Sequence, residues 1–443
     1  MKSALKNLKS FAGGLHPPDG KHFSAGKAIE ICPLPEELVI PLAQHIGAPA
    51  EACVEVGALV KKGSPIAKAK GFVSVPIHAS TSGEVIAVEP RLHPMGKHLP
   101  AVVIKPDGKD LWDDSLTGAD PQDLNAAELK NRLQAAGIVG LGGATFPTHV
   151  KLSPPADKPI DTLILNGVEC EPFLTADHRL MLEETERIFD GIDILRKILG
   201  ITRAVIGIEA NKPDAIELLT ARGAARQIEV QALEVKYPQG AEKQLIDAIT
   251  GRQVPSGTLP MEVGVVVQNV GTCAAISDAI RRGHPLVERV VSVTGPALVE
   301  PKNLLVRIGT SLQFLVDQCG GLNGTAAKII MGGPMMGQAQ LSLDVPAIRG
   351  TSGVLIFRQQ DLPRYEAGPC IRCGRCISVC PIHLQPTSIA ACARLDMIDQ
   401  AAGYHALDCI ECGCCTYICP ATLPLVQSIR YAKAAIMAQK RTT

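Results

Sequence analysis

Two short stretches of the sequence carry cysteines at matched spacing. "CIRCGRCISVCP" ends at Pro381 and "CIECGCCTYICP" ends at Pro420, and each places cysteines at i, i+3, i+6 and i+10 before a proline. Thiolates are soft ligands, and four of them satisfy a cubane iron–sulfur cluster. Zinc sites with four cysteines usually separate two C-x2-C halves by a long gap, which is absent here. The two runs therefore predict a pair of [4Fe–4S] clusters in preference to zinc knuckles.

The spacing also predicts which cysteines share a cluster. In a C-x2-C-x2-C-x3-C-P run, three cysteines wrap one cluster and the fourth ligates the other cluster. The two predicted ligand sets are Cys370, Cys373, Cys376 and Cys419, and Cys409, Cys412, Cys415 and Cys380. Cys414 is a spare thiol inside the second loop. The six remaining cysteines are interpreted as small buried apolar residues.

Length and composition limit the class of protein. At 443 residues and zero formal net charge, the chain can form about three domains and has no global field for nucleic acid. Only 3% of the residues are aromatic, which argues against a base-stacking surface. The longest charge-free windows lie within 376–393 and 412–429 and contain prolines and ligand-spaced cysteines, so neither is predicted to span a membrane. The basic N-terminus lacks the apolar region of a signal peptide, and without export fifteen cysteines indicate metal or redox chemistry.

The rest of the chain must position this chemistry, and it divides by its pattern. Residues 37–106 predict short strands broken at glycines. A polar connector follows, in which Asp123 or Asn125 could cap the next helix. Buried strands are predicted within 161–168, 203–210 and 228–235, with helices at 214–224 and 241–251. A second glycine-punctuated β-like stretch, 290–336, precedes the cysteine runs, so the fold class is multidomain α/β.

A cofactor site is predicted where a glycine-rich loop and a strand end follow one another. Clusters pass single electrons, and a flavin is the usual adaptor to hydride donors. The loop "GIVGLGGATFPTHVK" could let backbone amides approach a phosphate or a planar ring, although it follows a helix and so is not a Rossmann fingerprint. The strand "TLILN" delivers Asn166, Glu169 and Glu171 at its carboxyl end, and Lys151 is close enough in sequence to meet a phosphate.

These segments resemble known families. "GLGGATFPTHVK" with "NGVECEP" is similar to the glycine-rich and acidic segments of the NADH-binding flavoprotein subunit of respiratory complex I. The whole chain, from "GGLHPP" through "HASTSG" and "GGPMMG" to the cysteine runs, resembles the C subunits of the Rnf electron-transport complexes. The resemblance implies that FMN and NADH share one cleft. It implies flavin-side positions at Gly140, Gly142, Gly143, Lys151, Asn166, Glu169, Asn269 and Thr272, and nicotinamide-side positions at Phe146, Glu171 and Glu242.

Pattern and resemblance together predict the domains. These are a barrel-sandwich module of the biotinyl/lipoyl type at 1–115, an FMN/NADH-binding α/β domain at 120–285, a β-grasp-like domain at 286–345 and a helical double-cluster ferredoxin domain at 360–430. Lys70 lacks the sequence context of a carrier lysine, so the module is interpreted as structural.

The resemblance implies a peripheral electron-transfer subunit on the cytoplasmic face of the bacterial inner membrane. There it would exchange hydride between NADH and FMN and pass single electrons through the clusters of an ion-translocating ferredoxin:NAD oxidoreductase complex. The implied partners are the other subunits, especially a cluster-bearing sister subunit, and ferredoxin indirectly. The alternative is a non-enzymatic, ferredoxin-like scaffold whose flavin domain has degenerated.

Overall fold

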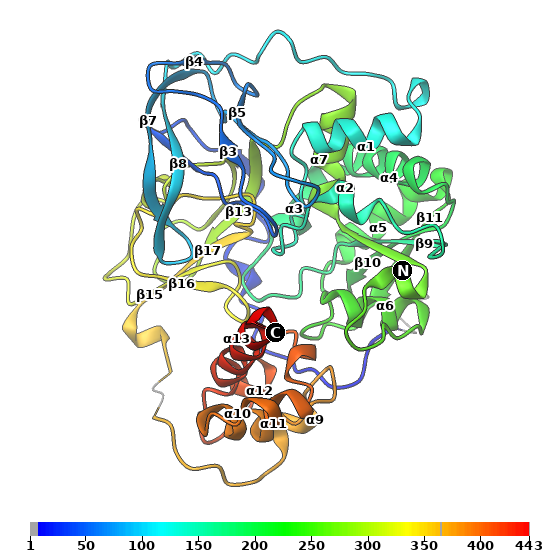
Figure 1. The fold of residues 1–443 in the computed structure, drawn as a ribbon, viewed down its shortest axis with the longest axis vertical. Helices are drawn as coiled ribbons and strands as arrows, with labels where there is room; N and C mark the ends of the chain where they lie inside the picture. Colours follow the sequence, from blue (N-terminus) through cyan, green and yellow to red (C-terminus); the bar gives the residue numbers. More distant parts are fainter. Residues whose placement is uncertain (1–7, 364–365, 443) are drawn as a thin grey trace.

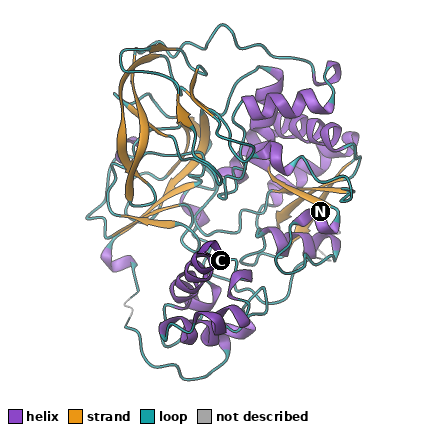
Figure 2. Cartoon of the chain, in the orientation of Figure 1, coloured by secondary structure: helices purple, strands orange, loops and turns teal. Residues whose placement is uncertain are grey.

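The structure is a computed structural model that describes residues 8–363 and 366–442. Most strands gather on one side of the molecule, whereas helices surround a smaller sheet on the other side and form a separate group at the bottom of the view (Figures 1 and 2). Six short 3-10 helices lie in the connections of the described chain: η1 (Lys21–Phe23), η2 (Pro121–Asp123), η3 (Ala224–Arg226), η4 (Pro260–Val263), η5 (Gln359–Asp361) and η6 (Ala406–Asp408).

The N-terminal module is a pair of small antiparallel sheets around one core. Their strand orders are β2-β8-β7-β4 and β3-β5-β6. The strands are β2 (Leu38–Pro41), β3 (Glu51–Ala52), β4 (Leu59–Val60), β5 (Pro65–Lys68), β6 (Ile77–His78), β7 (Gly83–His93) and β8 (Lys97–Pro106). The prediction of short strands is wrong for β7 and β8, which form one long hairpin. The reason is that Val85, Val102 and Ile104 alternate on one face and are fully buried against the second sheet.

The second region is a parallel sheet covered by helices. Its order is β11-β10-β9-β12, so the chain leaves β9 on one side and returns on the other. The strands are β9 (Thr162–Asn166), β10 (Ala204–Glu209), β11 (Ile228–Leu233) and β12 (Val265–Asn269). The helices are α1 (Ala126–Ala135), α2 (Thr148–Lys151), α3 (Ala176–Glu183), α4 (Thr185–Leu199), α5 (Pro213–Gly223), α6 (Glu242–Thr250) and α7 (Val270–Arg281). Asn125, not Asp123, caps α1 through a reciprocal capping box with Glu128.

The third region is a mixed six-stranded sheet of order β1-β14-β13-β17-β15-β16. Its elements are β1 (Ile29–Ile31), β13 (Glu288–Thr294), β14 (Lys302–Arg307), α8 (Leu312–Gln318), β15 (Lys328–Met331), β16 (Gln338–Gln340) and β17 (Gly353–Phe357). β1 and β17 come from outside the range 286–345 that was predicted for this domain. β1 forms one edge of the sheet by parallel pairing with β14, and β17 lies in its centre between parallel β13 and antiparallel β15. The local sequence pattern signals neither position.

The C-terminal region is a small helical domain joined by an extended segment. Its helices are α9 (Arg375–Ser378), α10 (Pro386–Arg394), α11 (Ile398–Gly403), α12 (Cys414–Tyr417) and α13 (Leu425–Thr442). Buried Ile389, Val426 and Ile429 form its core together with several of the cysteines. Over the part of the chain that the structure describes, no helix combines the length and the apolarity needed to cross a membrane.

An N-terminal segment fastens this helical domain to the parallel-sheet domain. The Gly14 amide donates a hydrogen bond to the Val379 carbonyl (2.9 Å), and Leu15 and Tyr237 exchange two backbone hydrogen bonds (2.9 and 2.8 Å). In Figure 1 the dark-blue segment passes between the green domain and the orange helices. Residues early in the sequence therefore hold two later regions together.

Candidate functional site

The carboxyl edge of the parallel sheet brings two predicted residues side by side. Asn166 ends β9, Asn269 ends β12, and the two residues are partners in the strand register. The strand order reverses at this point, which is where ligands bind in open α/β sheets. The Asn269 amide oxygen accepts hydrogen bonds from the backbone amides of Gly271 and Thr272, so it also starts α7.

The glycine-rich loop lies over the same edge. The Gly140 amide donates to the Phe146 carbonyl (2.9 Å), which closes the loop, and the Leu141 amide donates to the Thr272 hydroxyl (2.9 Å), which holds it on α7. Gly142 and Gly143 are exposed, and a side chain at Gly143 would meet nothing within 4 Å. Gly143 has a φ of +108°, a conformation that favours glycine. The loop therefore presents open backbone at the sheet edge, which fits a flat ring or a phosphate.

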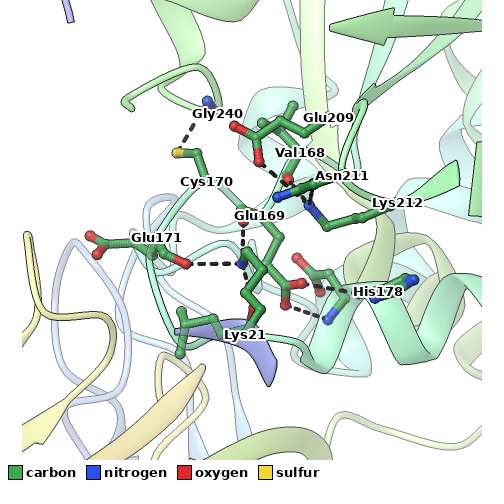
Figure 3. A network of polar contacts seen from close by, with 12 residues as sticks. Lys21, Val168, Glu169, Cys170, Glu171, His178, Glu209, Asn211, Lys212 and Gly240 are labelled. Carbon is green, nitrogen blue, oxygen red and sulfur yellow. Dashed lines mark hydrogen bonds and ion pairs between the residues drawn. The ribbon is translucent and has the colours of Figure 1, made fainter. Parts of the chain in front are cut away.

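The acidic loop after β9 is fixed by residues that the sequence did not single out. The Glu169 carboxylate accepts hydrogen bonds from the amides of Asp177 (2.8 Å) and His178 (3.3 Å) and so caps α3. Lys21 is buried, and its ammonium donates to the carbonyls of Glu169 (2.8 Å) and Glu171 (3.1 Å), as Figure 3 shows. Burial lowers the pKa of Lys21, with the nearby Lys212 acting in the same direction.

Lys212 supports the same loop from its other side. Its ammonium is buried and donates to the Val168 carbonyl (2.7 Å), with the Glu209 carboxylate at 3.5 Å (Figure 3). The motif "NKPD" directly after a buried strand was the available signal for Lys212. The neighbouring sequence does not mark Lys21, because the carbonyl groups that its ammonium contacts are 148 or more residues away.

Glu171 turns from the sheet edge toward the third region. Its carboxylate accepts hydrogen bonds from the amides of Met335 (3.0 Å) and Met336 (2.9 Å), in the "GGPMMG" loop. Burial raises the pKa of Glu171 to about 7, although these two amides and Lys21 act against the rise. The structure therefore engages this predicted nicotinamide-side residue in a contact between domains.

Two residues that the resemblance assigned to opposite sides of the cleft form an ion pair. The Lys151 ammonium, at the end of α2, lies 2.5 Å from the Glu242 carboxylate at the start of α6. The same ammonium donates to the Val267 carbonyl of β12 (2.8 Å). Phe146 is half-buried in the closed glycine loop. The structure thus gathers Lys151 and Glu242 beside β12, while Glu171 is held elsewhere.

The two cysteine loops have matching backbones. Gly374 and Gly413 both have positive φ (+75° and +80°), and a short helix, α9 or α12, starts directly after each. The Arg372 amide donates to the Cys370 sulfur and the Glu411 amide donates to the Cys409 sulfur, both at 3.4 Å. Hydrogen bonds to the ligand sulfurs are among the features that set the reduction potential of a cluster.

Cysteines from both motifs converge in the second loop. One cavity is lined by Cys409, Cys412, Cys414 and Cys415 of the second motif and by Cys380 of the first motif. Cys376 and Cys419 belong to the core of the helical domain, as Cys380, Cys409 and Cys415 also do, whereas Cys370 and Cys373 are exposed. Among residues 8–363 and 366–442, no three histidine, cysteine, aspartate or glutamate side chains converge as ligands of one metal ion. A cubane binds each thiolate at a different iron, so its ligands surround a volume instead of a point.

The second loop is packed against the parallel-sheet domain. The Tyr237 hydroxyl donates to the Cys412 carbonyl (2.8 Å), and Leu15, Tyr237, Cys412 and Cys414 form one buried apolar cluster. Cys170, in the acidic loop after β9, packs against the same cluster. The predicted flavin region and the second cysteine loop therefore share a continuous interface.

The other cysteines are only partly as predicted. The buried ones are Cys32, Cys273, Cys319 and Cys392, and Cys170 is half-buried. The prediction of burial is wrong for Cys53, which is exposed because it directly follows the short strand β3.

Comparison with known domain families matches each region of the chain. The Nuo51 FMN-binding domain matches residues 133–278, and a 4Fe-4S dicluster domain matches 362–420. The RnfC barrel sandwich hybrid domain matches 9–109, and the SLBB domain matches 290–339. These matches define the class, an electron-transfer flavoprotein with two iron–sulfur clusters. They confirm the predicted fold class and the predicted cofactors, FMN and two [4Fe–4S] clusters.

Full-length relatives narrow the class to one family. The C subunit of the proton-translocating ferredoxin:NAD(+) oxidoreductase complex of Clostridium ljungdahlii is 51% identical over 96% of this chain and 94% of its own. The C subunit of the Na(+)-translocating ferredoxin:NAD(+) oxidoreductase complex of Acetobacterium woodii is 49% identical over 98% of each chain. The protein belongs to the family of these C subunits, as the resemblance predicted. It is therefore a component of a larger redox complex.

A solved structure shares the fold at low sequence identity. An NAD+-reducing [NiFe]-hydrogenase in the H2-reduced state aligns with a TM-score of 0.50 and 18% identity, over 72% of this chain and 65% of that chain. At this identity the similarity concerns the fold alone.

Proposed function

We propose that this chain oxidises or forms NADH at the carboxyl edge of the parallel sheet and passes single electrons to the rest of an ion-translocating ferredoxin:NAD oxidoreductase complex. FMN, when bound, supplies the conversion between hydride and single electrons. The observation that carries the proposal is the interface between the acidic loop after β9 and the second cysteine loop, where Cys170 and Tyr237 meet Cys412 and Cys414. The open glycine loop beside Asn166 and Asn269 favours a working flavin site over a scaffold with a degenerate flavin domain.

The residues of the edge have distinct proposed roles. The open backbone of Gly142 and Gly143 admits the flavin ring, and Asn166 and Asn269 border it from the two strand ends. Lys151 offsets phosphate charge, and Glu242 acts by holding the Lys151 ammonium in place. Glu169 positions the acidic loop by capping α3. Water is excluded at the rear of the edge by the fully buried strands β9 and β12.

The cysteine packing supports an order for the two ligand sets. Cys409, Cys412, Cys415 and Cys380 form the inner set, which the motif spacing separates from Cys414 although all five line one cavity, and their loop is packed against the parallel-sheet domain. Cys370, Cys373, Cys376 and Cys419 form the outer set, two of whose thiols are exposed. The inner set is therefore proposed to lie between the flavin and the outer set on the electron path.

The test of the flavin site is Gly142→Val. Gly142 does not have a positive φ, and an added side chain would make only ordinary contact with Asn269, 3.5 Å away, so the loop can fold with valine. The variant should lose FMN and NADH-dependent reduction while retaining both clusters, as measured by the anaerobic absorption spectrum and iron content. Gly26→Val, at an exposed glycine with nothing within 4 Å, is the matched control and should retain FMN. Full NADH dehydrogenase activity in Gly142→Val would refute the site.

The proposed location is the cytoplasmic face of the bacterial inner membrane, reached through partner subunits that include a cluster-bearing sister subunit. The described chain contains no helix suited to cross a membrane. The protein should therefore be released from membranes by high salt without detergent. A protein that stays wholly soluble in cells expressing every partner subunit would contradict this location and leave the flavin site untouched.

A further inference from the structure

The two cysteine loops can be compared position by position, because their backbones match. Ile410 in the inner loop packs against the apolar cluster of Leu15, Tyr237 and Cys414. Its counterpart in the outer loop, Ile371, is 65% exposed. The same side chain is therefore covered in one loop and uncovered in the other.

The glycines of the two loops show the same difference. A side chain at Gly413 would meet the Met335 carbonyl oxygen at 3.1 Å, whereas a side chain at Gly374 would meet nothing within 4 Å. Elements of the same chain thus cover one face of the inner loop. The equivalent face of the outer loop has no cover within the described residues.

The uncovered loop and the helix α9 that follows it expose two isoleucines and two arginines. We call this surface the outer face and define it by Ile371, Arg372, Arg375 and Ile377, all of which are exposed. Ile377 is 44% exposed. Arg372 and Arg375 stand where the inner loop has Glu411 and Cys414.

The charges of the outer face are unbalanced. Glu411 forms ion pairs with Arg430 (2.8 Å) and Lys433 (2.6 Å), whereas across the described chain neither Arg372 nor Arg375 forms an ion pair. The sequence between Glu366 and Asp396 contains no acidic residue. Interfaces that pair an apolar centre with a charged rim use the rim to steer and orient a partner of opposite charge.

We infer that the outer face docks a redox protein that presents acidic side chains around its own one-electron centre. The inference rests on the proposed function, since it names the surface through which the outer ligand set exchanges electrons. The apolar side chains Ile371 and Ile377 supply close contact, as Ile410 does on the inner loop, and the two arginines supply attraction and orientation. Each NADH yields NAD+, one proton and two electrons, so two one-electron acceptors are reduced in turn.

The test uses two haem proteins of opposite charge as probes. The full-length protein, loaded with FMN and clusters, is mixed anaerobically with NADH and either acidic cytochrome b5 or basic cytochrome c. The wild-type protein should reduce the acidic probe faster at low ionic strength. Arg372→Glu/Arg375→Glu should slow reduction of the acidic probe by about tenfold or more and speed reduction of the basic probe, and both effects should shrink as salt is added.

A matched control and a second variant separate a loss of docking from a general effect of charge and from a loss of iron. Arg394→Glu/Lys440→Glu makes the same charge change at exposed positions of the same helical domain and should leave both rates near wild type. If the double reversal loses iron, Arg375→Gln alone should still weaken the preference for the acidic probe. Cluster reduction by NADH is followed by electron paramagnetic resonance in every variant.

Three results would overturn the docking surface. They are unchanged rates with cytochrome b5, equal slowing with both probes, and an effect of Arg372→Glu/Arg375→Glu on binding to vesicles of anionic lipid without any effect on the cytochrome rates. If NADH reduces no cluster in the wild-type protein, the proposed function itself fails. The two failures are therefore distinguishable.

Discussion

The loop 370–376 and the loop 409–415 share ligand spacing, a glycine with positive φ and an amide that donates to a cysteine sulfur. They differ in their surroundings. The inner loop is buried under Leu15, Tyr237 and Met335, and the outer loop keeps an exposed isoleucine and two arginines without an ion pair among the described residues. The same local motif can thus hold a cluster inside a protein or at its surface. The packing of other parts of the chain against the loop decides between the two, and the motif does not encode that packing.

The largest effect is expected from replacing the fourth cysteine of either motif, because each is predicted to ligate the cluster of the other loop. Cys380→Ser should remove the inner cluster although Cys380 belongs to the outer motif, and Cys419→Ser should remove the outer cluster. Each variant should lose about four of about eight irons per chain. The paramagnetic resonance spectrum of Cys380→Ser should match that of Cys409→Ser, and the spectrum of Cys419→Ser should match that of Cys370→Ser. The opposite matching would show that each motif ligates its own cluster.

A smaller effect is expected in the pH dependence of stability, through Glu171, whose carboxylate holds the Met335 loop that covers the inner cysteine loop. Burial raises the pKa of Glu171 to about 7 from 4.5. Between these values the folded state binds more protons than the unfolded state, so stability falls as pH rises through this window and then levels off. The loss is on the order of 3 kcal/mol.

Glu171→Gln should remove this dependence. The measurement is the temperature of cluster bleaching from pH 5 to 8, taken as the difference between wild type and variant. A difference that does not change with pH would mean that the carboxyl is ionised throughout. Asp177, whose pKa burial and Glu169 also raise to about 7, remains in both proteins and cancels in the comparison.

The two loop glycines should respond unequally to alanine. Gly374→Ala should cost about 1 kcal/mol from the positive φ alone. Gly413→Ala has the same strain and in addition a contact with the Met335 carbonyl at 3.1 Å, so it should bleach at a lower temperature than Gly374→Ala. Equal bleaching temperatures would show that the Met335 backbone can shift away from Gly413 at little cost. The two loops would then differ less in stability than their packing suggests.

The smallest effect is expected at the spare thiol. Cys414→Ser should keep about eight irons per chain, because the predicted ligand sets are complete without Cys414. Its fully buried sulfur lies in an apolar cluster, so a hydroxyl there should cost about 1 kcal/mol. Iron quantitation checks the first expectation. A loss of half the iron would make Cys414 a ligand and would break the equivalence of the two loops.

The sequence was most informative where function depends on neighbours in the chain. The cysteine spacing, the buried runs of β9 and β10 and the cap at Asp123 or Asn125 are local patterns. They predicted the dicluster domain, two strands and a capped helix whose cap is Asn125, whereas the ligand sets stay a prediction. The pairing of Asn166 with Asn269 was not predicted, because residues 265–269 were not among the predicted strands and only the resemblance marked Asn269. Hydrophobic periodicity could not predict the contacts of Lys21, the ion pair between Lys151 and Glu242 or the contact of Glu171 with Met335. Their partners are 91 to 164 residues away, and only packing decides which face each side chain meets.

The segment around Gly14 and Leu15 has a consequence for biosynthesis. Its partners Tyr237 and Val379 are translated more than two hundred and more than three hundred and sixty residues later, respectively. During translation this strap must therefore wait without its final contacts while the intervening domains fold, since domains generally fold as units as they emerge. The strap then adds its bonds to direct contacts between the two domains, such as the hydrogen bond that the Tyr237 hydroxyl donates to the Cys412 carbonyl.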